Sequence, residues 1–341
     1  MNRRILAILD REERFAKGLM EYLMSKDSLP FRIHMFTDVD CFMEYQSSQE
    51  IECLLIAENM YFEAVAKTGI PHIIVLDENG INKDNTLHHI SKYQSAEMIY
   101  KQILSYYTEL STESINIVRT NNHKLKIIAV YTPIGRCLQT TFAITLGQIL
   151  AKDAKTLYLN FERYSGLANL LKKEFSKDIS DLMYYFECAK EKLSVRIETL
   201  VDKMGDLDFI PPANLFGNLC GIKGSDWIDL FHEMEKCTEY EYLILDLTDG
   251  IPDLCEVLKD ADVVYTLTKQ DRIALSKMRQ YENILKGYEY EDVLSKTKKV
   301  SLPVFKSLPN KFEEYSMSEL SSFIRLNIVP QLTQVSQNHD G

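Results

Sequence analysis

The sequence lacks an excess of positive charge, which limits the partners that it can bind. Its 341 residues include 39 lysines and arginines against 50 aspartates and glutamates, giving a formal net charge of −11 at pH 7. Binding to nucleic acid through its phosphates depends on a basic surface, so the composition argues against nonspecific binding. A local basic patch stays compatible with these numbers. We expect no specific nucleic-acid partner.

Long apolar runs and closely paired cysteines are also missing. No apolar run approaches the roughly 18 residues that a membrane helix requires, so we expect any membrane contact to be indirect. The chain starts Met-Asn-Arg-Arg, without the apolar stretch and cleavage site of a secretory signal, which predicts a cytoplasmic protein. The seven cysteines are scattered and never form a C-x-x-C pair, and we interpret them as reduced thiols.

The length allows two domains, and the order of patterns indicates their kind. A chain of 341 residues is long enough for two ordinary α/β domains with separate cores. In the first hundred residues, strand and helix patterns alternate, which is typical of βα units around a parallel sheet. Strands are expected at 5–9, 32–36, 53–57 and 73–76, with helices at 12–25, 39–47 and 95–107.

A polar stretch at 108–124 precedes a second set of α/β patterns. Its composition favours a linker between domains. The sequence therefore predicts the α/β class, with two doubly wound parallel-sheet domains at 1–107 and 125–330 and a flexible tail at 331–341. Strands of the second domain are expected at 127–131, 156–160, 207–210, 242–246, 263–267 and 304–308.

One loop has the layout of a phosphate-binding loop without most of the usual residues. It lies in YTPIGRCLQTTFAITLGQIL, which starts at Tyr131, between a strand pattern and an apolar-periodic helix. In a loop of the type G-x-x-x-x-G-K-[ST], glycines let main-chain amides converge on phosphate, lysine neutralises charge, and the hydroxyl binds Mg²⁺.

The flanking pattern resembles the deviant Walker-A ATPases of the MinD/ParA class, whose loop reads K-G-G-x-G-K-[ST]-[ST]. In that resemblance Ile134 replaces the signature lysine, and Arg136 and Leu138 replace two glycines. A bulky residue at a left-handed glycine position costs about 1–2 kcal/mol, so Leu138 predicts strain or an altered loop. Gln139 replaces the P-loop lysine, and this loss removes positive charge from the place where phosphoryl transfer develops negative charge. Slow or absent hydrolysis is therefore expected, while binding could persist on main-chain donors and Mg²⁺.

The residues that the loop keeps are the first glycine and the two threonines. The resemblance implies ATP and Mg²⁺ as cofactors, with the Thr140 hydroxyl on the metal. It also implies a nucleotide-binding loop made of Gly135, Arg136, Cys137, Leu138, Gln139, Thr140 and Thr141.

Two strand ends carry further residues that match this class. The pattern at 242–246 ends in Asp246, and the resemblance implies that this Walker-B aspartate holds Mg²⁺ through its water shell. The strand at 156–160 leads into the position of a D-x-D motif, in which Asn160 and Glu162 replace the aspartates. The resemblance implies a catalytic position for both, with Glu162 orienting the attacking water.

The first domain resembles a response-regulator receiver. Asp10 and Glu12 follow the first strand, where receivers carry an acidic pair, and Lys92 matches the usual receiver lysine. The phospho-accepting position is Ala57, which has no nucleophile and so excludes an aspartyl phosphate. Glu58 is adjacent but would point to the opposite face of the strand. These four residues, Asp10, Glu12, Ala57 and Lys92, predict a pseudo-receiver pocket in a binding or dimerising module.

A pseudo-receiver followed by a deviant Walker-A ATPase is the arrangement of the TadZ/CpaE pilus-assembly proteins, and the resemblance covers about residues 1–330. It implies an ATP-binding homodimer that positions components of a Tad (type IVb) pilus or secretion system, at a cell pole or the inner face of the membrane. Two alternatives stay open: a MinD/ParA-type ATPase with real turnover in positioning or partitioning, and a scaffold without nucleotide. A related tyrosine kinase is disfavoured, because residues 331–341 contain no tyrosine.

Overall fold

The fold was analysed in a computed structural model. It describes residues 4–26, 29, 31–78, 87–110 and 124–332. The chain divides into two compact units, each with its own sheet, which are described separately. Most of the predicted linker (108–124) and of the predicted tail (331–341) lies outside the described residues.

The first domain contains a five-stranded parallel sheet in the order β2-β1-β3-β4-β5. This is the flavodoxin-like order, in which ligands bind at the carboxyl ends of the strands where the order reverses. The strands are β1 (Arg4–Leu9), β2 (Phe31–Phe36), β3 (Ile51–Ala57), β4 (His72–Asp77) and β5 (His88–Ser91).

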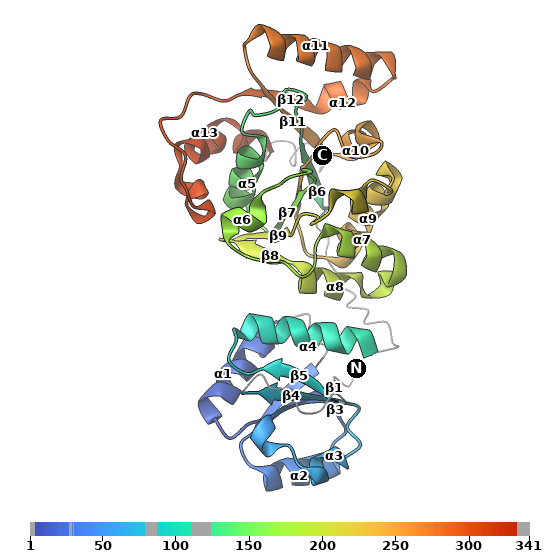
Figure 1. Ribbon diagram of the computed structural model, residues 1–341, viewed down its shortest axis with the longest axis vertical. Helices are drawn as coiled ribbons and strands as arrows, with labels where there is room; N and C mark the ends of the chain where they lie inside the picture. The colour runs from blue at the N-terminus through green and yellow to red at the C-terminus, as the bar shows by residue number, and fades with distance from the viewer. Residues whose placement is uncertain (1–3, 27–28, 30, 79–86, 111–123, 333–341) are drawn as a thin grey trace, which may run out of the picture. The chain divides into compact units, whose positions relative to one another are not determined.

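Helices cover both faces of this sheet (Figure 1). On one face, α1 (Glu13–Met24) and α4 (Ala96–Leu110) pack on the strands; α1 contributes Ala16, Leu19 and Leu23, the helical spacing of a buried stripe. The opposite face is covered by α2 (Val39–Ser48), the short helix η1 (Glu58–Met60) and α3 (Glu63–Ala66), which contribute Phe42, Met60 and Val65 to a second core.

The second domain contains a seven-stranded sheet in the order β12-β11-β6-β10-β7-β9-β8. All neighbouring strands are parallel except β8 and β9, which are antiparallel. The strands are β6 (Lys126–Val130), β7 (Thr156–Asn160), β8 (Asp202–Met204), β9 (Leu207–Ile210), β10 (Tyr242–Asp246), β11 (Val263–Thr268) and β12 (Thr297–Ser301).

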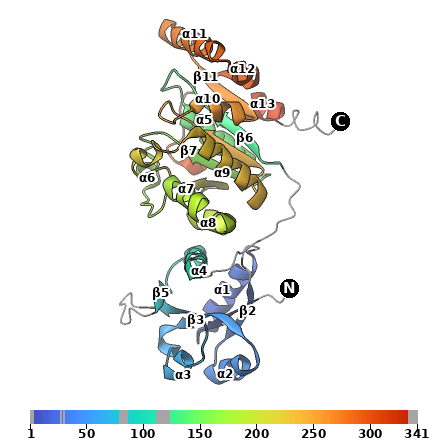
Figure 2. The same cartoon turned by 90° about the vertical axis from the view of Figure 1, so that its right-hand side faces the viewer.

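Helices also cover both faces of the second sheet, with α5 and α13 on one face and α9 and α10 on the other (Figure 1). Helix α5 lies close to the strands because Gly147 has no side chain: a Cβ there would stand 2.8 Å from a methyl group of Leu207. Figures 1 and 2 both show α11 and α12 lying together, near β11. The helices that follow β6 in the sequence are α5 (Gln139–Leu150), α6 (Leu167–Leu171), α7 (Ile179–Cys188), η2 (Lys190–Lys192), α8 (Leu193–Leu200), η3 (Phe216–Leu219), α9 (Gly224–Cys237), α10 (Leu254–Asp260), α11 (Arg272–Gly287), α12 (Glu291–Lys296), η4 (Phe312–Met317) and α13 (Glu319–Asn327).

The predicted fold class, two doubly wound α/β domains with parallel sheets, is confirmed, but one predicted strand is wrong. No strand forms at 304–308; the edge strand is instead β12, with the sequence TKKVS, in which only Val300 is buried. Pro303 and Pro309 flank the apolar segment and cannot donate to a strand ladder. Lysines are common on edge strands because they discourage pairing with other chains, and here they mask the strand pattern.

Candidate functional site

The loop between β6 and α5 keeps a left-handed backbone although its glycines are mostly lost. Gly135, Arg136 and Leu138 have φ angles of 73°, 49° and 64°. Only the glycine adopts this region without cost, and each of the other two side chains costs about 1–2 kcal/mol. The backbone therefore keeps positive φ angles at Arg136 and Leu138, the two positions where glycines of the deviant Walker-A pattern are replaced.

Main-chain donors of this loop are available to a ligand. Within the described ranges, the amides of Gly135, Arg136 and Leu138 donate to no protein acceptor. Leu138 precedes α5 and gives that helix no side-chain cap, so the first turn also presents unpaired amides. Converging amides at the positive end of a helix dipole fit the phosphates of a nucleotide.

Asp246 lies beside the start of α5, where the sheet register brings three strand ends together. It pairs with Val130 on β6 and with Asn160 on β7, and its side chain is fully buried. The Gln139 side chain reaches this carboxylate: its Nε2 donates to Oδ1 of Asp246 at 2.6 Å and to the carbonyl oxygen of Leu247 at 2.9 Å. A neutral amide thus occupies the place next to Asp246 at the position of the P-loop lysine.

The second carboxylate oxygen of Asp246 is engaged as well. Its Oδ2 accepts hydrogen bonds from the Tyr158 hydroxyl at 2.9 Å and from Nδ2 of Asn160 at 3.0 Å. Burial raises the pKa of Asp246, while hydrogen bonds from Gln139, Thr140, Tyr158 and Asn160 act in the opposite direction. The carboxylate is therefore satisfied by neutral protein donors on both oxygens.

A metal ion at this site would need oxygen ligands from outside the protein. Among the residues that the structure describes, no group of three or more histidine, cysteine, aspartate or glutamate side chains could hold a metal. Thr140 and Asp246 lie within hydrogen-bonding distance and supply one hydroxyl and one carboxylate. Mg²⁺ commonly takes one or two protein ligands and completes its shell with water and substrate phosphate. The pair fits such a partial site.

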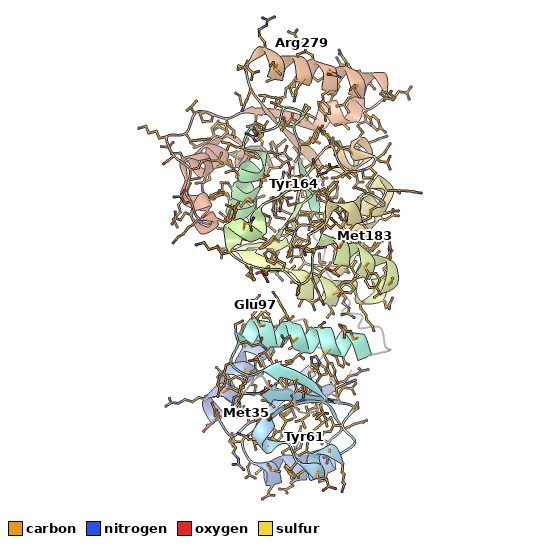
Figure 3. All side chains as sticks on the ribbon, viewed as in Figure 1. Met35, Tyr61, Glu97, Tyr164, Met183 and Arg279 are labelled. Carbon is orange, nitrogen blue, oxygen red and sulfur yellow. The ribbon has the colours of Figure 1, made fainter. Side chains whose placement is uncertain are left out.

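The side chains of Asn160 and Glu162 lie next to this carboxylate. Oδ1 of Asn160 accepts a hydrogen bond from the amide of Glu162 at 3.0 Å, so Asn160 links the loop after β7 to Asp246. Glu162 is half-buried, and its burial raises its pKa, with further contributions from the charges of Asp246 and Asp249. The same loop exposes Tyr164, which is 90% accessible to solvent (Figure 3). The catalytic roles that the sequence predicted for Asn160 and Glu162 stay predictions.

Several neighbours of the site did not follow from the sequence patterns. The Tyr131 hydroxyl donates to Asp249, and burial raises the pKa of this tyrosine. Tyr158 could have been found, because residues two positions apart on a strand share a face and Tyr158 precedes Asn160 by two.

Two lysines from the β11–α11 region also contact the loop. Nζ of Lys269 donates to the carbonyl oxygen of Arg136 at 2.7 Å, and Nζ of Lys277 lies 3.5 Å from the carbonyl oxygen of Ile134. No loop motif could have indicated these two side chains, because more than 130 positions separate each of them from its partner.

The residues predicted for a pseudo-receiver pocket lie together at the carboxyl edge of the first sheet. Nζ of Lys92 lies 2.9 Å from Asp10 Oδ2, 2.9 Å from Glu12 Oε1 and 3.1 Å from Glu78 Oε1. Glu78 follows β4 and was not predicted from the sequence. Ala57 ends β3 beside these residues and is fully buried. Four predicted residues are thus brought to one edge of the sheet, with a third carboxylate added.

Lys92 is almost completely buried, so its charge depends on these carboxylates. Its side chain is 1% exposed, and its ammonium also lies 5.0 Å from the centre of the Phe15 ring. Burial by itself lowers the pKa of Lys92, but hydrogen bonds to Asp10, Glu12 and Glu78 outweigh burial and raise it. An internal ammonium thus balances one of the three carboxylate charges in this cluster.

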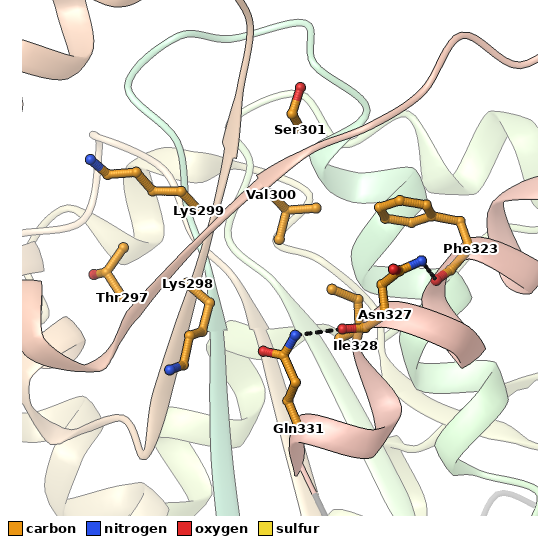
Figure 4. A pocket seen from close by; sticks show the side chains of 9 residues that line it. All are labelled: Thr297, Lys298, Lys299, Val300, Ser301, Phe323, Asn327, Ile328 and Gln331. Atoms are coloured by element: carbon orange, nitrogen blue, oxygen red, sulfur yellow. Dashed lines mark hydrogen bonds between the residues drawn. The ribbon is translucent and has the colours of Figure 1, made fainter.

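A separate groove lies between the edge strand β12 and helix α13 (Figure 4). Thr297 and Ser301 mark the two ends of its strand side, and Phe323 and Gln331 line the opposite side. Within α13 and the turn after it, Asn327 donates to the carbonyl oxygen of Phe323 at 2.9 Å, and Gln331 donates to that of Asn327 at 2.6 Å. None of the groove residues belongs to the loop site.

Comparison with known proteins separates the two domains. Residues 1–108 match the family model of the TadZ-like receiver domain, which confirms the predicted resemblance for this part of the chain. No curated protein matches the chain. None of the helices in the described ranges is both long and apolar enough to cross a membrane.

Similar solved structures include a ParA family ATPase, an ATP complex of McdA and a cell division complex. A ParA family ATPase from Chlorobium tepidum is 20% identical, with 52% of this chain and 73% of that chain covered and a TM-score of 0.44. A Cyanothece McdA–ATP complex is 15% identical, with 54% and 70% covered and a TM-score of 0.42. The MinC:MinD cell division complex of Aquifex aeolicus is 18% identical, with 53% and 69% covered and a TM-score of 0.40.

Proposed function

Because residues 1–108 of this chain match the family model of the TadZ-like receiver domain, we propose that the protein is an ATP-binding, dimerising assembly factor of a Tad (type IVb) pilus or secretion system. The second domain, which we place at 125–330 after a linker at 108–124, binds ATP and forms the homodimer. The first domain is a binding module for other assembly components. The protein acts in the cytoplasm, at a cell pole or at the inner face of the membrane.

The observation that carries this proposal is the shape of the loop before α5. Its left-handed residues leave main-chain amides available next to a helix N-terminus, and they do so despite the cost at Arg136 and Leu138. Strained backbone persists where the surrounding structure fixes it, commonly at ligand sites. The seven residues from Gly135 to Thr141 would surround the phosphates, and Thr140 with Asp246 would hold Mg²⁺.

Hydrolysis is slow or absent in this proposal. Gln139 is neutral and already donates to Asp246, so it adds no positive charge at the phosphate that would be transferred. Glu162 is left as the group that can position a water molecule, with Asn160 holding its main chain. Binding without rapid turnover stabilises the ATP-bound dimer by mass action, and dimer lifetime then depends on nucleotide release.

A scaffold without nucleotide is the second candidate, and one observation favours it. Asp246 has neutral protein donors on both oxygens, so the site is satisfied without a metal. A MinD/ParA-type ATPase with real turnover is the remaining alternative. It requires measurable phosphate release at a site that lacks both lysines of the class.

Binding and sizing measurements separate these functions. We expect saturable binding of labelled ATP to the full chain, tighter with Mg²⁺ than with a chelator, and a shift from monomer to dimer mass in light scattering when ATP is added. The absence of saturable binding at millimolar ATP would leave the scaffold. Phosphate release at a rate that rises on dimerisation would favour the ATPase with turnover.

A further inference from the structure

The loop before α5 has lost two positive charges, and two other lysines stand next to it. Ile134 and Gln139 occupy the places of the two lysines of the deviant Walker-A pattern. The ammonium group of Lys269 contacts the main-chain carbonyl of Arg136, and that of Lys277 contacts the main-chain carbonyl of Ile134. Both lysines are distant from the loop in the sequence. Lys277 thus reaches the residue that replaces the signature lysine.

The fold fixes Lys269 beside the loop. Two hydrogen bonds join the loop to the end of β11: the amide of Tyr131 donates to the carbonyl oxygen of Tyr265 at 3.1 Å, and the Thr132 hydroxyl donates to that of Leu267 at 2.7 Å. Lys269 follows Leu267 by two residues. Its position is therefore set by the pairing of β11 with β6 rather than by the side chain alone.

Helix α11 fixes Lys277 in the same way. The helix starts after Asp271, whose carboxylate accepts hydrogen bonds from the amides of Ile273 and Ala274. This cap anchors the helix and engages the nearest acidic side chain of the segment. Lys277 follows on the exposed surface of α11, the helix that also carries the exposed Arg279 (Figure 3).

Neither ammonium is neutralised. In the described part of the chain, Lys269 and Lys277 donate to main-chain carbonyls, and neither lysine forms an ion pair with a carboxylate. An ammonium has three N–H donors, so each side chain retains donors for another acceptor. Charge-assisted hydrogen bonds to phosphate are stronger than bonds to a neutral carbonyl.

We propose that Lys269 and Lys277 supply, from outside the loop, the positive charge that binds the polyphosphate of a nucleoside triphosphate. This inference rests on the proposed ATP binding and names the residues that make it possible without a P-loop lysine. Both are phosphate-binding residues, and the amides of the loop act together with them. A nucleoside monophosphate, which carries one phosphate group, gains much less from these two side chains.

The test compares ATP with AMP in single variants of the full chain. We expect Lys269→Met to weaken ATP binding about tenfold, the size of one charged hydrogen bond, and to change AMP binding less than about threefold. Lys277→Met should have the same direction and a smaller size, because its contact is longer. Lys269→Arg should restore most of the affinity. Lys286→Met is the matched control, since Lys286 is exposed on the same helix with no contact to the loop.

The outcomes distinguish this inference from the proposed function. Wild-type protein that binds no ATP would contradict both. Wild-type binding that the Lys269 and Lys277 variants leave unchanged would overturn only the inference. An equal loss for ATP and AMP would also overturn it, because the lysines would then only hold the loop in shape. Far-ultraviolet circular dichroism of each variant checks that the fold is retained.

Discussion

The two sheets present acidic residues at their carboxyl edges, and protein donors engage them in different ways. In the first domain the ammonium of Lys92 lies within 3.1 Å of three carboxylates. In the second domain the carboxylate of Asp246 is bound by Gln139, Tyr158 and Asn160, all of them neutral. One site therefore contains its own cation, and the other contains only hydrogen-bond donors.

This difference decides what each site can still bind. In the first domain, the ammonium of Lys92 contacts all three carboxylates and balances one of their three negative charges. Asp246 forms no ion pair in the part of the chain that the structure describes, so its negative charge is left for an external cation to neutralise. We infer that a metal ion entering the first site would compete with Lys92 for the same carboxylates, whereas the second site has no protein cation to displace and can accept Mg²⁺ with a nucleotide.

The largest effect is expected from removing the internal cation. Lys92→Met should destabilise the first domain by about 3–5 kcal/mol, because it leaves a buried carboxylate without its partner. Urea unfolding of the full chain is monitored by hydrogen exchange of the amides in β1 and β4, which measures the stability of the first domain separately from that of the second. The control is Lys67→Met: Lys67 pairs with Glu63 on an exposed helix surface, where such pairs are worth about 0.5 kcal/mol or less.

The pH dependence of the first domain tests the same ion pair without a mutation. Because the pKa of Lys92 is raised above its ordinary value of about 10.5, the stabilisation is complete below pH 10.5 and is lost as the pH rises further. Lys92→Met should remove this part of the alkaline loss. If Lys92→Met left both the alkaline loss of stability and the free energy of unfolding nearly unchanged, a stabilising buried ion pair at Lys92 would be contradicted.

The second-largest effect is expected at Asp246. Asp246→Ala leaves the donors of Gln139, Tyr158 and Asn160 unpaired in a buried place, and should destabilise the second domain by about 2–3 kcal/mol. Asp246→Asn keeps the shape and one acceptor, so it should cost less. Both variants remove the charge and should abolish the Mg²⁺-dependent part of ATP affinity, measured by titration calorimetry with and without chelator. Unchanged Mg²⁺ dependence would place the metal elsewhere.

The sequence predicted the architecture well because apolar strands and their spacing are local signals. Strand ends such as Asp246 and Asn160 could be placed from the same patterns, since carboxyl ends of parallel strands meet at one edge. The strand β12 was missed because its lysines hide it. The contacts of Glu78 and Lys269 could not be predicted, because they depend on side chains that the fold brings together from distant parts of the chain.

The loop conformation shows a further limit. The sequence indicated strain or a changed path at Leu138 without deciding between them, because a residue type alone does not fix φ. The structure keeps the left-handed angle at Leu138 and adds a second one at Arg136. The partner of Gln139 was equally hidden: a missing lysine predicts lost charge, but only the register of β10 beside β6 brings Asp246 to its amide.

Adding a cation to the second site should make it more like the first. Gln139→Lys replaces a neutral donor to Asp246 with a charged one, and should stabilise the second domain by about 1 kcal/mol. The same change should raise ATP affinity several-fold, since the ammonium stands at the head of α5. Thermal unfolding and ATP titration measure the two effects. Gln139→Met, which removes the donor without adding charge, should lower stability, and a neutral result for both would mean that the loop does not follow a P-loop path.

The smallest effect is expected from relieving the strain of the loop while leaving its charges alone. Leu138→Gly removes a side chain at φ 64°, which recovers about 1–2 kcal/mol, but glycine costs about 0.5–1 kcal/mol in entropy, so the net gain is between about 0 and 1.5 kcal/mol. Leu215→Gly is the matched control, since Leu215 is an exposed leucine before a short helix at φ −124° and should only lose stability. Equal losses in the two variants would mean that Leu138 is unstrained in solution. A gain at Leu138 alone, with ATP affinity kept, would show that the loop amides rather than the leucine side chain form the binding surface.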